Sequence, residues 1–223
     1  MTEYINWVWA LPTRNFSLFT FNFFYYQVVN NSASRYQNIT GGIFMEFKGS
    51  RTEANLMAAF AGESQARNKY TFYAARAKKD GYEQIADIFM KTADNEKEHA
   101  EIWLKQLHGG DIPETTENLR DAAAGENYEW TEMYKEFERV ATEEGFTQIA
   151  ALFKMVGAIE KEHEKRFKTL RENLEKGIVF SREGETVWIC RNCGHLHVGK
   201  EAPAMCPVCS HARAYFEIKC DNY

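Results

Sequence analysis

Cysteine is absent from the first 189 residues of this 223-residue chain, and all five cysteines lie in the last 34. A disulfide scaffold would distribute its cysteines through a small secreted domain, so this clustering argues against one. The sequence also lacks any run of about 18 or more apolar residues, which argues against a membrane-spanning helix. Its formal net charge of −5 provides no basic field of the kind that binds nucleic acid. The clustered cysteines instead indicate a metal site in a reducing compartment.

Residues 1–44 differ in composition from the rest of the chain. They contain a Phe/Tyr-rich run, Phe16 to Tyr26, followed by an Asn/Ser/Gly-rich stretch over residues 30–42. The run resembles a signal peptide only faintly, because polar residues dilute its apolar core and Glu3 lies in the segment before it. We interpret residues 1–44 as an extension of unknown role, either disordered or a misassigned start, with Met45 opening the main protein.

Four helical segments are predicted between residue 51 and about residue 176. Apolar and small side chains recur there at alternating steps of three and four residues, which is the period of one α-helical face. The third segment is expected to run from about Glu117 to Glu144. Glycines suited to the left-handed C′ position follow the segments. The expected ends are Asp80-Gly81, Gly109-Gly110, Gly145 and Lys176-Gly177.

An internal repeat relates the two halves of this helical region. Residues 77–99 read AKKDGYEQIADIFMKTADNEKEH, and residues 141–163 read ATEEGFTQIAALFKMVGAIEKEH, at a constant offset of 64. Two copies of one helix pair predict a four-helix bundle with approximate two-fold symmetry. We therefore expect a mainly α protein in which residues 45–176 form the bundle.

Acidic residues occupy stripe positions that an ordinary bundle would make apolar. Two Glu-x-x-His pairs stand at the same phase of the repeat, and positions i and i+3 project from the same side of a helix. Ionised carboxylates in a dry core cost on the order of several kcal/mol each unless cations replace the lost water. Two metals satisfy this need, and oxygen-rich ligation with one imidazole each suits iron or manganese. The candidate ligands are Glu63, Glu96, His99, Glu126, Glu129, Glu160 and His163.

The bland interpretation of a single Glu-x-x-His is a solvated helix face. Two instances in register with a repeat, each on an apolar stripe, favour the metal instead. Tyr70 and Tyr134 fall near the same faces. They are either amphipathic core tyrosines or donors of a hydrogen bond to a ligand carboxylate, and their spacing leaves both roles open.

Residues 177–223 carry a second metal motif and change from helical to β-type patterning. Short stretches over 185–189 and 214–219 predict a small β domain, which needs a metal because so few residues bury little core. Four thiolates arranged as two Cys-x-x-Cys pairs complete a tetrahedral site for zinc or a single iron. Cys220 lies outside the motif and is expected to be a spare thiol. The motif, C-x₂-C…C-x₂-C with 12 residues between the pairs, comprises Cys190, Cys193, Cys206 and Cys209.

Taken together, these motifs resemble the rubrerythrin family over about residues 45–223, and not over residues 1–44. The resemblance implies a ferritin-like four-helix bundle followed by a small β-rich rubredoxin-like domain. It is carried by AFAGESQARNKY (59–70), GYEQIADIF (81–89), NEKEHAE (95–101), AAAGENYEWTEMY (122–134), IEKEHEKRF (159–167) and, in the tail, WICRNCG and APAMCPVC.

The resemblance also implies a function. The seven Glu and His candidates would ligate a non-haem di-iron centre that reduces hydrogen peroxide to water, with one iron exchanging Glu129 for His99 as its oxidation state changes. Tyr70 and Tyr134 match tyrosines that lie beside these ligands. The four cysteines would hold one further iron. Electrons would arrive from a rubredoxin or an NAD(P)H-dependent reductase, in a homodimer that serves oxidative-stress defence. The reduced cysteines and the lack of a convincing signal peptide separately predict a cytoplasmic location, and the charge and hydropathy predict no nucleic-acid or membrane partner.

Two other functions account for parts of the pattern. A ferritin-type ferroxidase or iron-storage protein shares the bundle and the Glu-x-x-His pairs, but it needs no Cys₄ electron donor and the additional Glu126 is unlike it. A non-enzymatic zinc-ribbon interaction protein would leave the acids on the apolar stripes unexplained.

Overall fold

The computed structural model describes residues 46–221 of the chain. The predicted extension over residues 1–44 lies outside these described residues. No helix in the described part is both long and apolar enough to cross a membrane.

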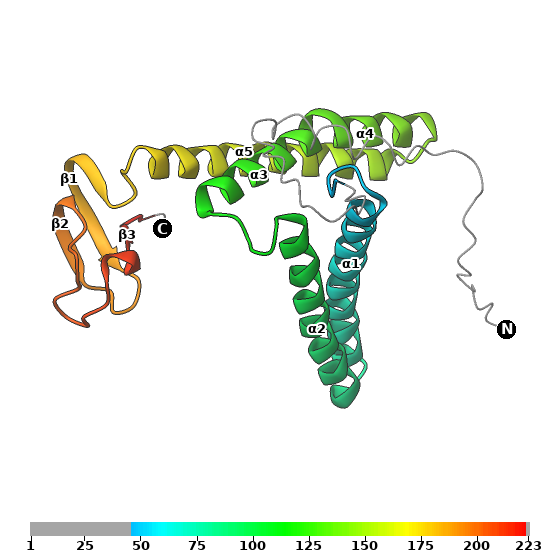
Figure 1. Ribbon diagram of the computed structural model, residues 1–223, viewed down its shortest axis with the longest axis horizontal. Coiled ribbons are helices and arrows are strands. Elements are labelled where there is room, and N and C mark those ends of the chain that lie inside the picture. Colours follow the sequence, from blue (N-terminus) through cyan, green and yellow to red (C-terminus); the bar gives the residue numbers. More distant parts are fainter. Residues whose placement is uncertain (1–45, 222–223) are drawn as a thin grey trace, which may run out of the picture. The chain divides into compact units, whose positions relative to one another are not determined.

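The first helix pair consists of α1 (Arg51–Lys79) and α2 (Glu83–Leu107), which lie side by side (Figure 1). Small side chains let the two helices approach closely, because an alanine adds only one methyl group to the interface. The buried residues between them include Ala74, Ala77 and Ala86, with Phe89 packed against them.

Both ends of α1 follow from local sequence. The Ser50 hydroxyl accepts a hydrogen bond from the N–H of Glu53 at 3.1 Å, which satisfies one of the unpaired donors at the helix start. At the other end Gly81 adopts a φ of +87°, and the N–H of Tyr82 donates to the Ala77 carbonyl at 2.9 Å. This glycine-based cap ends the helix and turns the chain into α2.

The second pair sets three consecutive segments against one long helix. α3 (Thr115–Tyr128), η2 (Glu129–Met133) and α4 (Tyr134–Glu143) all pack on α5 (Thr147–Glu175). The single helix predicted over residues 117–144 is therefore wrong in one respect, because five residues in its middle form a π-helical turn. Such a turn accommodates one inserted residue without ending the helix.

The repeat itself locates that inserted residue. Glu63 and Glu126 are 63 positions apart, whereas Tyr70 and Tyr134 are 64 apart. The second copy therefore has one extra residue between its glutamate and its tyrosine, which is the interval that contains η2. The two copies therefore differ in backbone structure at a predicted ligand, because Glu129 is the first residue of the π turn.

Matching aromatic clusters confirm that the two pairs are copies of one unit. In the first cluster the Tyr73 and Phe89 ring centroids are 5.6 Å apart, and in the second the Phe137 and Phe153 centroids are 5.4 Å apart. Tyr70 and Tyr134 complete the clusters, each at 6.0 Å from the phenylalanine of α2 or α5. The members of each cluster are related by the offset of 64, namely Tyr70, Tyr73 and Phe89 with Tyr134, Phe137 and Phe153.

The C-terminal region forms a small antiparallel sheet with strand order β2-β1-β3. The strands are β1 (Ser181–Cys190), β2 (Leu196–Glu201) and β3 (Phe216–Ile218). The stretches predicted at 185–189 and 214–219 correspond to parts of β1 and β3, whereas β2 was not predicted. The buried core of this region is Trp188, Cys190, Ala202, Cys206 and Phe216, so two of the four motif cysteines belong to the core itself.

Candidate metal centres

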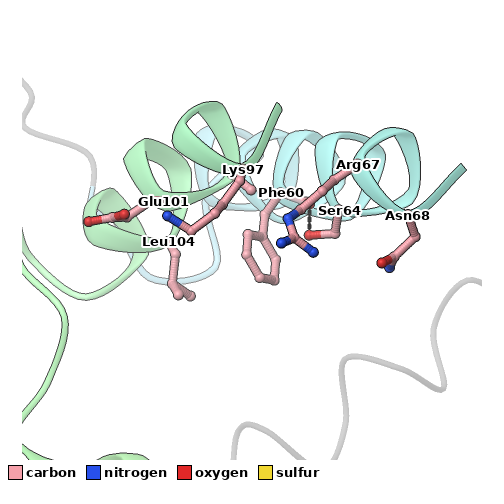
Figure 2. A pocket seen from close by; sticks show the side chains of 8 residues that line it. Phe60, Ser64, Arg67, Asn68, Lys97, Glu101 and Leu104 are labelled. Carbon is pink, nitrogen blue, oxygen red and sulfur yellow. Dashed lines mark hydrogen bonds between the residues drawn. The ribbon is translucent and has the colours of Figure 1, made fainter. Parts of the chain in front are cut away.

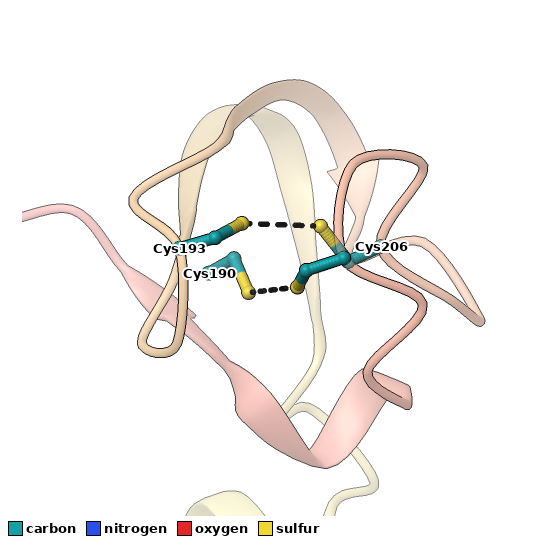
Figure 3. A group of neighbouring side chains, drawn as sticks. Cys190, Cys193 and Cys206 are labelled. Carbon is teal, nitrogen blue, oxygen red and sulfur yellow. Dashed lines mark hydrogen bonds between the residues drawn. The ribbon is translucent and has the colours of Figure 1, made fainter.

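The four motif cysteines gather at one end of the sheet, with their sulfur atoms within 4.8 Å of one another (Figure 3). Cys190 Sγ lies 3.7 Å from Cys209 Sγ, and Cys193 Sγ lies 3.6 Å from Cys206 Sγ. The spacing is too long for disulfides, whose S–S bond is about 2.0 Å. It suits a single ion held by four thiolates.

Two equivalent turns present these thiols. The N–H of Gly194 donates to the Cys190 carbonyl, and the N–H of Ser210 donates to the Cys206 carbonyl, both at 2.9 Å. Gly194 and Ser210 both have positive φ, +76° and +59°. Each Cys-x-x-Cys unit is therefore closed by a backbone hydrogen bond of its own, and the two turns present their thiols to one cluster.

The donor chemistry of the cluster fits a cation. The N–H of His195 alone lowers the pKa of the Cys193 thiol, but hydrogen bonds with the neighbouring thiols together with burial outweigh it and raise that pKa to about 12. Four adjacent thiols cannot all ionise near neutral pH unless a positive ion lies between them. A thiolate-preferring metal such as iron or zinc supplies that charge.

The first Glu/His group belongs to the α1–α2 pair. Glu63 of α1 and Glu96 and His99 of α2 bring one potential ligand atom each to within 4.8 Å of the others. His99 Nδ1 lies 2.9 Å from a Glu96 carboxylate oxygen and 4.0 Å from one of Glu63. The His99 side chain is 50% exposed, so the group lies at the surface of its helix pair.

The second group belongs to the α3–α5 pair and repeats the first. Glu126 of α3 and Glu160 and His163 of α5 also lie within 4.8 Å of one another. His163 Nδ1 is 2.6 Å from a Glu160 oxygen and 3.7 Å from one of Glu126. Each group thus combines two carboxylates with one imidazole, which is three of the seven ligand residues expected for the di-iron centre.

Charge is concentrated in the second group. Burial raises the pKa of Glu126, and the neighbouring Glu160 carboxylate raises it further. The same two causes, in the same order, raise the pKa of Glu129. Glu129 lies outside the group of three, but it is close enough to the Glu160 carboxylate for the two negative charges to repel each other. A divalent cation would remove the repulsion that these raised pKa values record.

One described chain presents the predicted ligands as two separate groups. Within residues 46–221, α1 packs on α2, whereas α3, η2 and α4 pack on α5. The sequence predicts one di-iron centre from both groups, and each group by itself leaves coordination positions open.

The two predicted tyrosines lie beside these groups. Burial, followed by repulsion from the Glu129, Glu160 and Glu126 carboxylates, raises the pKa of Tyr134. A tyrosine hydroxyl is ordinarily protonated at neutral pH, and this shift leaves it so, with a hydrogen to donate. Among the described residues neither Tyr70 nor Tyr134 donates a hydrogen bond to a ligand carboxylate, so their role beside the metal stays a prediction.

Glu164 is a residue that the sequence reasoning missed. It is the buried charged residue of the described chain, 6% exposed. One carboxylate oxygen accepts from Asn127 Nδ2 at 3.0 Å, the other accepts from Trp130 Nε1 at 2.6 Å, and Lys168 forms an ion pair with it. Burial alone raises the pKa of Glu164, but these partners outweigh burial and lower it. The carboxylate fastens α5 to residues on both sides of Glu129.

The repeat contained a signal for Glu164. At the offset of 64 it corresponds to Ala100, which is buried in the first pair. A carboxylate in one copy where the other has a buried alanine indicates that the second copy has polar donors opposite that position. The π turn, which the first pair lacks, provides one of those donors, Trp130, and the end of α3 provides the other, Asn127.

Comparison with known proteins gives two family matches. The model of rubrerythrin matches residues 54–171, and the model of the rubredoxin-like domain of rubrerythrin matches residues 188–217. The chain is 52% identical to rubrerythrin of Porphyromonas gingivalis over 187 residues, which cover 79% of this chain and 94% of that one. It is 50% identical to rubrerythrin of Nitratidesulfovibrio vulgaris over 182 residues, covering 77% and 95%.

More distant similarity extends to an archaeal protein and to a solved structure. The putative rubrerythrin of Methanocaldococcus jannaschii is 46% identical over 193 residues, covering 77% of this chain and 94% of that one. A solved mixed-valence state of nigerythrin is 30% identical and covers 76% of this chain and 87% of its own, with a TM-score of 0.29. A TM-score of this size has no bearing on the fold.

Proposed function

Because the chain belongs to the rubrerythrin family, we propose that it reduces hydrogen peroxide to water at its di-iron centre, with electrons passed through its Cys₄ iron. Its fold is mainly α and ferritin-like, followed by a three-stranded sheet with a cysteine cluster. The observation that carries the proposal is the presence in one chain of two Glu/His groups and four clustered thiols. A peroxidase needs both, since one holds the reacting metals and the other returns electrons.

The two Glu/His groups and Glu129 fit the di-iron centre by their donor chemistry. Bound irons would polarise the O–O bond of peroxide and supply electrons to it. The chain contributes carboxylates that offset the charge of the metals and imidazoles that complete their coordination. The residues that we propose as ligands are Glu63, Glu96, His99, Glu126, Glu129, Glu160 and His163.

The hydroxyls of Tyr70 and Tyr134 would orient these ligands. Reduction of peroxide to two waters consumes two protons, so a protonated donor near the reacting oxygen atoms favours the reaction. Tyr134 is protonated at neutral pH, and the upward direction of its pKa shift reinforces that state. We propose that each tyrosine donates to a ligand carboxylate in the assembled bundle and holds that carboxylate in one orientation.

The Cys₄ iron of Cys190, Cys193, Cys206 and Cys209 is a one-electron carrier, and thiolate ligation and burial set its potential. Upstream, we propose a rubredoxin or an NAD(P)H-dependent reductase as the donor. Since the thiols must stay reduced to bind iron, we place the protein in the cytoplasm. We propose that it acts there as a homodimer in defence against peroxide.

Steady-state peroxide reduction by the Cys206→Ser variant tests this electron path. The variant should lose the Cys₄ iron and at least about tenfold of its turnover with a reductase and rubredoxin as donor, while one oxidation of the pre-reduced di-iron centre by peroxide still occurs. Cys220→Ser is the matched control, because Cys220 is exposed and lies outside the cluster. Unchanged turnover in Cys206→Ser would mean that electrons reach the di-iron centre by another route.

A further inference from the structure

The long helices α2 and α5 of the two copies each bury a seam of residues spaced seven apart. The seam of α2 is Ala86, Ala93 and Ala100, and the equivalent seam of α5 is Ala150, Gly157 and Glu164. The first position is alanine in both copies, whereas α5 departs from α2 at the second and third positions. Seven residues make about two helical turns, so both departures lie on one face of α5.

Glu164 contacts the start of the π turn. Its carboxylate accepts hydrogen bonds from Trp130 Nε1 at 2.6 Å and from Asn127 Nδ2 at 3.0 Å. Trp130 is the second residue of the turn, and the centroid of its ring also lies 5.2 Å from Lys161 Nζ of α5. Hydrogen bonds to a charged acceptor are shorter and stronger than neutral ones, so the buried carboxylate fixes where these donors lie.

Gly157 contacts the residue that follows the turn. Tyr134 begins α4 directly after Met133, the last residue of the π turn. A Cβ atom added to Gly157 would lie 3.2 Å from the Tyr134 Cβ atom, which is closer than most such contacts. The glycine therefore lets the chain leave the π turn close against α5. The two departures in the seam of α5 thus lie against the two ends of the π turn.

Four residues form a network around Glu164, and each directly follows a predicted metal ligand. They are Asn127 after Glu126, Trp130 after Glu129, Lys161 after Glu160 and Glu164 after His163. Neighbouring side chains on a helix point about 100° apart, so this Glu164 network lies beside the ligands. A backbone shift that moves a network residue also moves the ligand before it. Glu129 lies in the π turn itself, so it depends on the network most directly.

The first helix pair has a groove at the equivalent place (Figure 2). Ala100, the equivalent of Glu164, lines this groove together with Ser64, the equivalent of Asn127 at the offset of 63. The Ser64 hydroxyl donates to the Phe60 carbonyl of its own helix at 2.7 Å. Helix α1 is continuous here, without a π turn. The Glu164 network and the π turn therefore occur together in one copy and are replaced together in the other.

We propose that Glu164 is a positioning residue for the di-iron centre, because it holds the π turn through Trp130 and thereby keeps the Glu129 carboxylate in its ligand position. Both oxygen atoms of Glu164 accept from side chains of α3 and η2, so Glu164 acts on the ligands from outside the ligand set. The existence of the centre rests on the proposed function, and the role of Glu164 rests on the contacts of α5 with the π turn.

Binding of Fe(II) tests this role without any reaction with peroxide. Protein depleted of bundle iron is titrated with Fe(II) without oxygen, and the ions bound in addition to the Cys₄ iron are counted. Loss of a group that orients a ligand weakens metal binding about 10- to 100-fold. Glu164→Ala should weaken one of the two bundle ions by that factor, and Glu164→Gln, which keeps an acceptor for Trp130, should lie between it and the wild type. Unchanged affinity in Glu164→Ala would overturn the proposal.

The reduction potential of the bundle irons is a readout that a loss of stability alone would not move. A carboxylate stabilises ferric iron more than ferrous iron, because it offsets the larger positive charge. Displacement of Glu129 in Glu164→Ala should therefore raise the potential of the bundle irons. The potential of the Cys₄ iron in the same protein should stay at the wild-type value. Equal bundle potentials in Glu164→Ala and the wild type would overturn the proposal.

Trp130→Phe tests whether Glu164 acts through the indole. This variant removes the donor at Nε1 and keeps an aromatic ring, so it should weaken Fe(II) binding as Glu164→Ala does. The double variant should bind Fe(II) about as weakly as either single variant, because two residues on one path are not additive. Fully additive losses of affinity would show that Glu164 does not act through Trp130 and would overturn the proposal.

Two controls separate positioning from stability and from charge. Ser50→Ala weakens the cap of α1, and Glu162→Ala removes an exposed acid of α5 next to His163. Both should keep the wild-type Fe(II) affinity and potential, and a change in Ser50→Ala as large as that in Glu164→Ala would overturn the proposal. A wild-type bundle that binds no Fe(II) would contradict the proposed function, whereas a bundle that binds two ions equally with or without Glu164 would contradict only the positioning role.

Discussion

The Glu164 carboxylate should contribute more to stability than any exposed acid on α5. Replacing it by alanine removes the acceptor for Asn127 Nδ2 and Trp130 Nε1, which bond to it at 3.0 and 2.6 Å. A buried donor left without an acceptor costs about 1–3 kcal/mol. The ion pair with Lys168 adds at most about 1 kcal/mol, since the lysine side chain is 52% exposed. We expect Glu164→Ala to lower the free energy of unfolding by about 3 kcal/mol.

The conservative variant separates the hydrogen bonds from the charge. A glutamine at position 164 keeps one carbonyl oxygen, so it can satisfy one of the two donors while its NH₂ group faces the other. Glu164→Gln should therefore lose about 1–2 kcal/mol, between the wild type and Glu164→Ala. Urea unfolding of the metal-free protein at one fixed chain concentration measures these differences.

Glu162→Ala is the matched control on the same helix. Its side chain is 65% exposed and lies 3.8 Å from Lys165 in a surface pair, so its removal should change the free energy of unfolding by less than about 0.5 kcal/mol. If Glu164→Ala were no more destabilising than Glu162→Ala, the carboxylate would not fasten the π turn, and the account of how Glu129 is positioned would be wrong.

Three further predictions concern the other parts of the chain. Removing the Cys₄ metal with a chelator should unfold the small sheet, because a domain of this size needs its metal to fold. Trp188, which is fully buried beside two of the cysteines, should then become exposed. A red shift of tryptophan emission with unchanged helical circular dichroism would show this, and unchanged emission would contradict it. Tyr134→Phe should keep its iron but slow the reaction of the reduced protein with peroxide about ten- to a hundredfold, whereas Tyr73→Phe, which has phenylalanine at the equivalent Phe137, should react at the wild-type rate. Ser50→Ala should cost about 1 kcal/mol in thermal or urea unfolding through loss of the α1 cap, and an unchanged midpoint would mean that the cap contributes nothing.

The features that sequence predicted well are those with a period or a fixed spacing. Helix phase placed Glu63 beside Glu96, and Glu126 beside Glu160, because stripe positions of neighbouring helices must face each other. The Cys-x-x-Cys spacing predicted the thiol cluster because a separation of three residues places two thiols on one turn. The predicted rubrerythrin resemblance and the mainly α fold with a small metal-bearing sheet are confirmed.

The features that sequence did not predict depend on contacts between distant residues. The π turn is visible only as a change of offset from 63 to 64 between two pairs of residues. Glu164 is a charged residue in a charged helix until its partners Asn127 and Trp130, more than 30 positions earlier, are placed against it. Strand β2 forms by pairing with β1, and the residue pattern of β2 alone does not predict that pairing. The separation of the ligands into two groups depends on which helices pair, α1 with α2 and α3 with α5.

The most direct test of the proposed peroxidase is a stopped-flow comparison of two oxidants. The protein, loaded with about three irons per chain and fully reduced without oxygen, is mixed with equal concentrations of hydrogen peroxide or O₂. The absorbance of the di-iron centre and of the red Cys₄ iron is followed in each case. A peroxidase predicts that peroxide oxidises the di-iron centre at least about tenfold faster than O₂ and that the Cys₄ iron is oxidised in turn. Faster oxidation by O₂, with zinc in the cysteine site, would contradict it and indicate a ferroxidase.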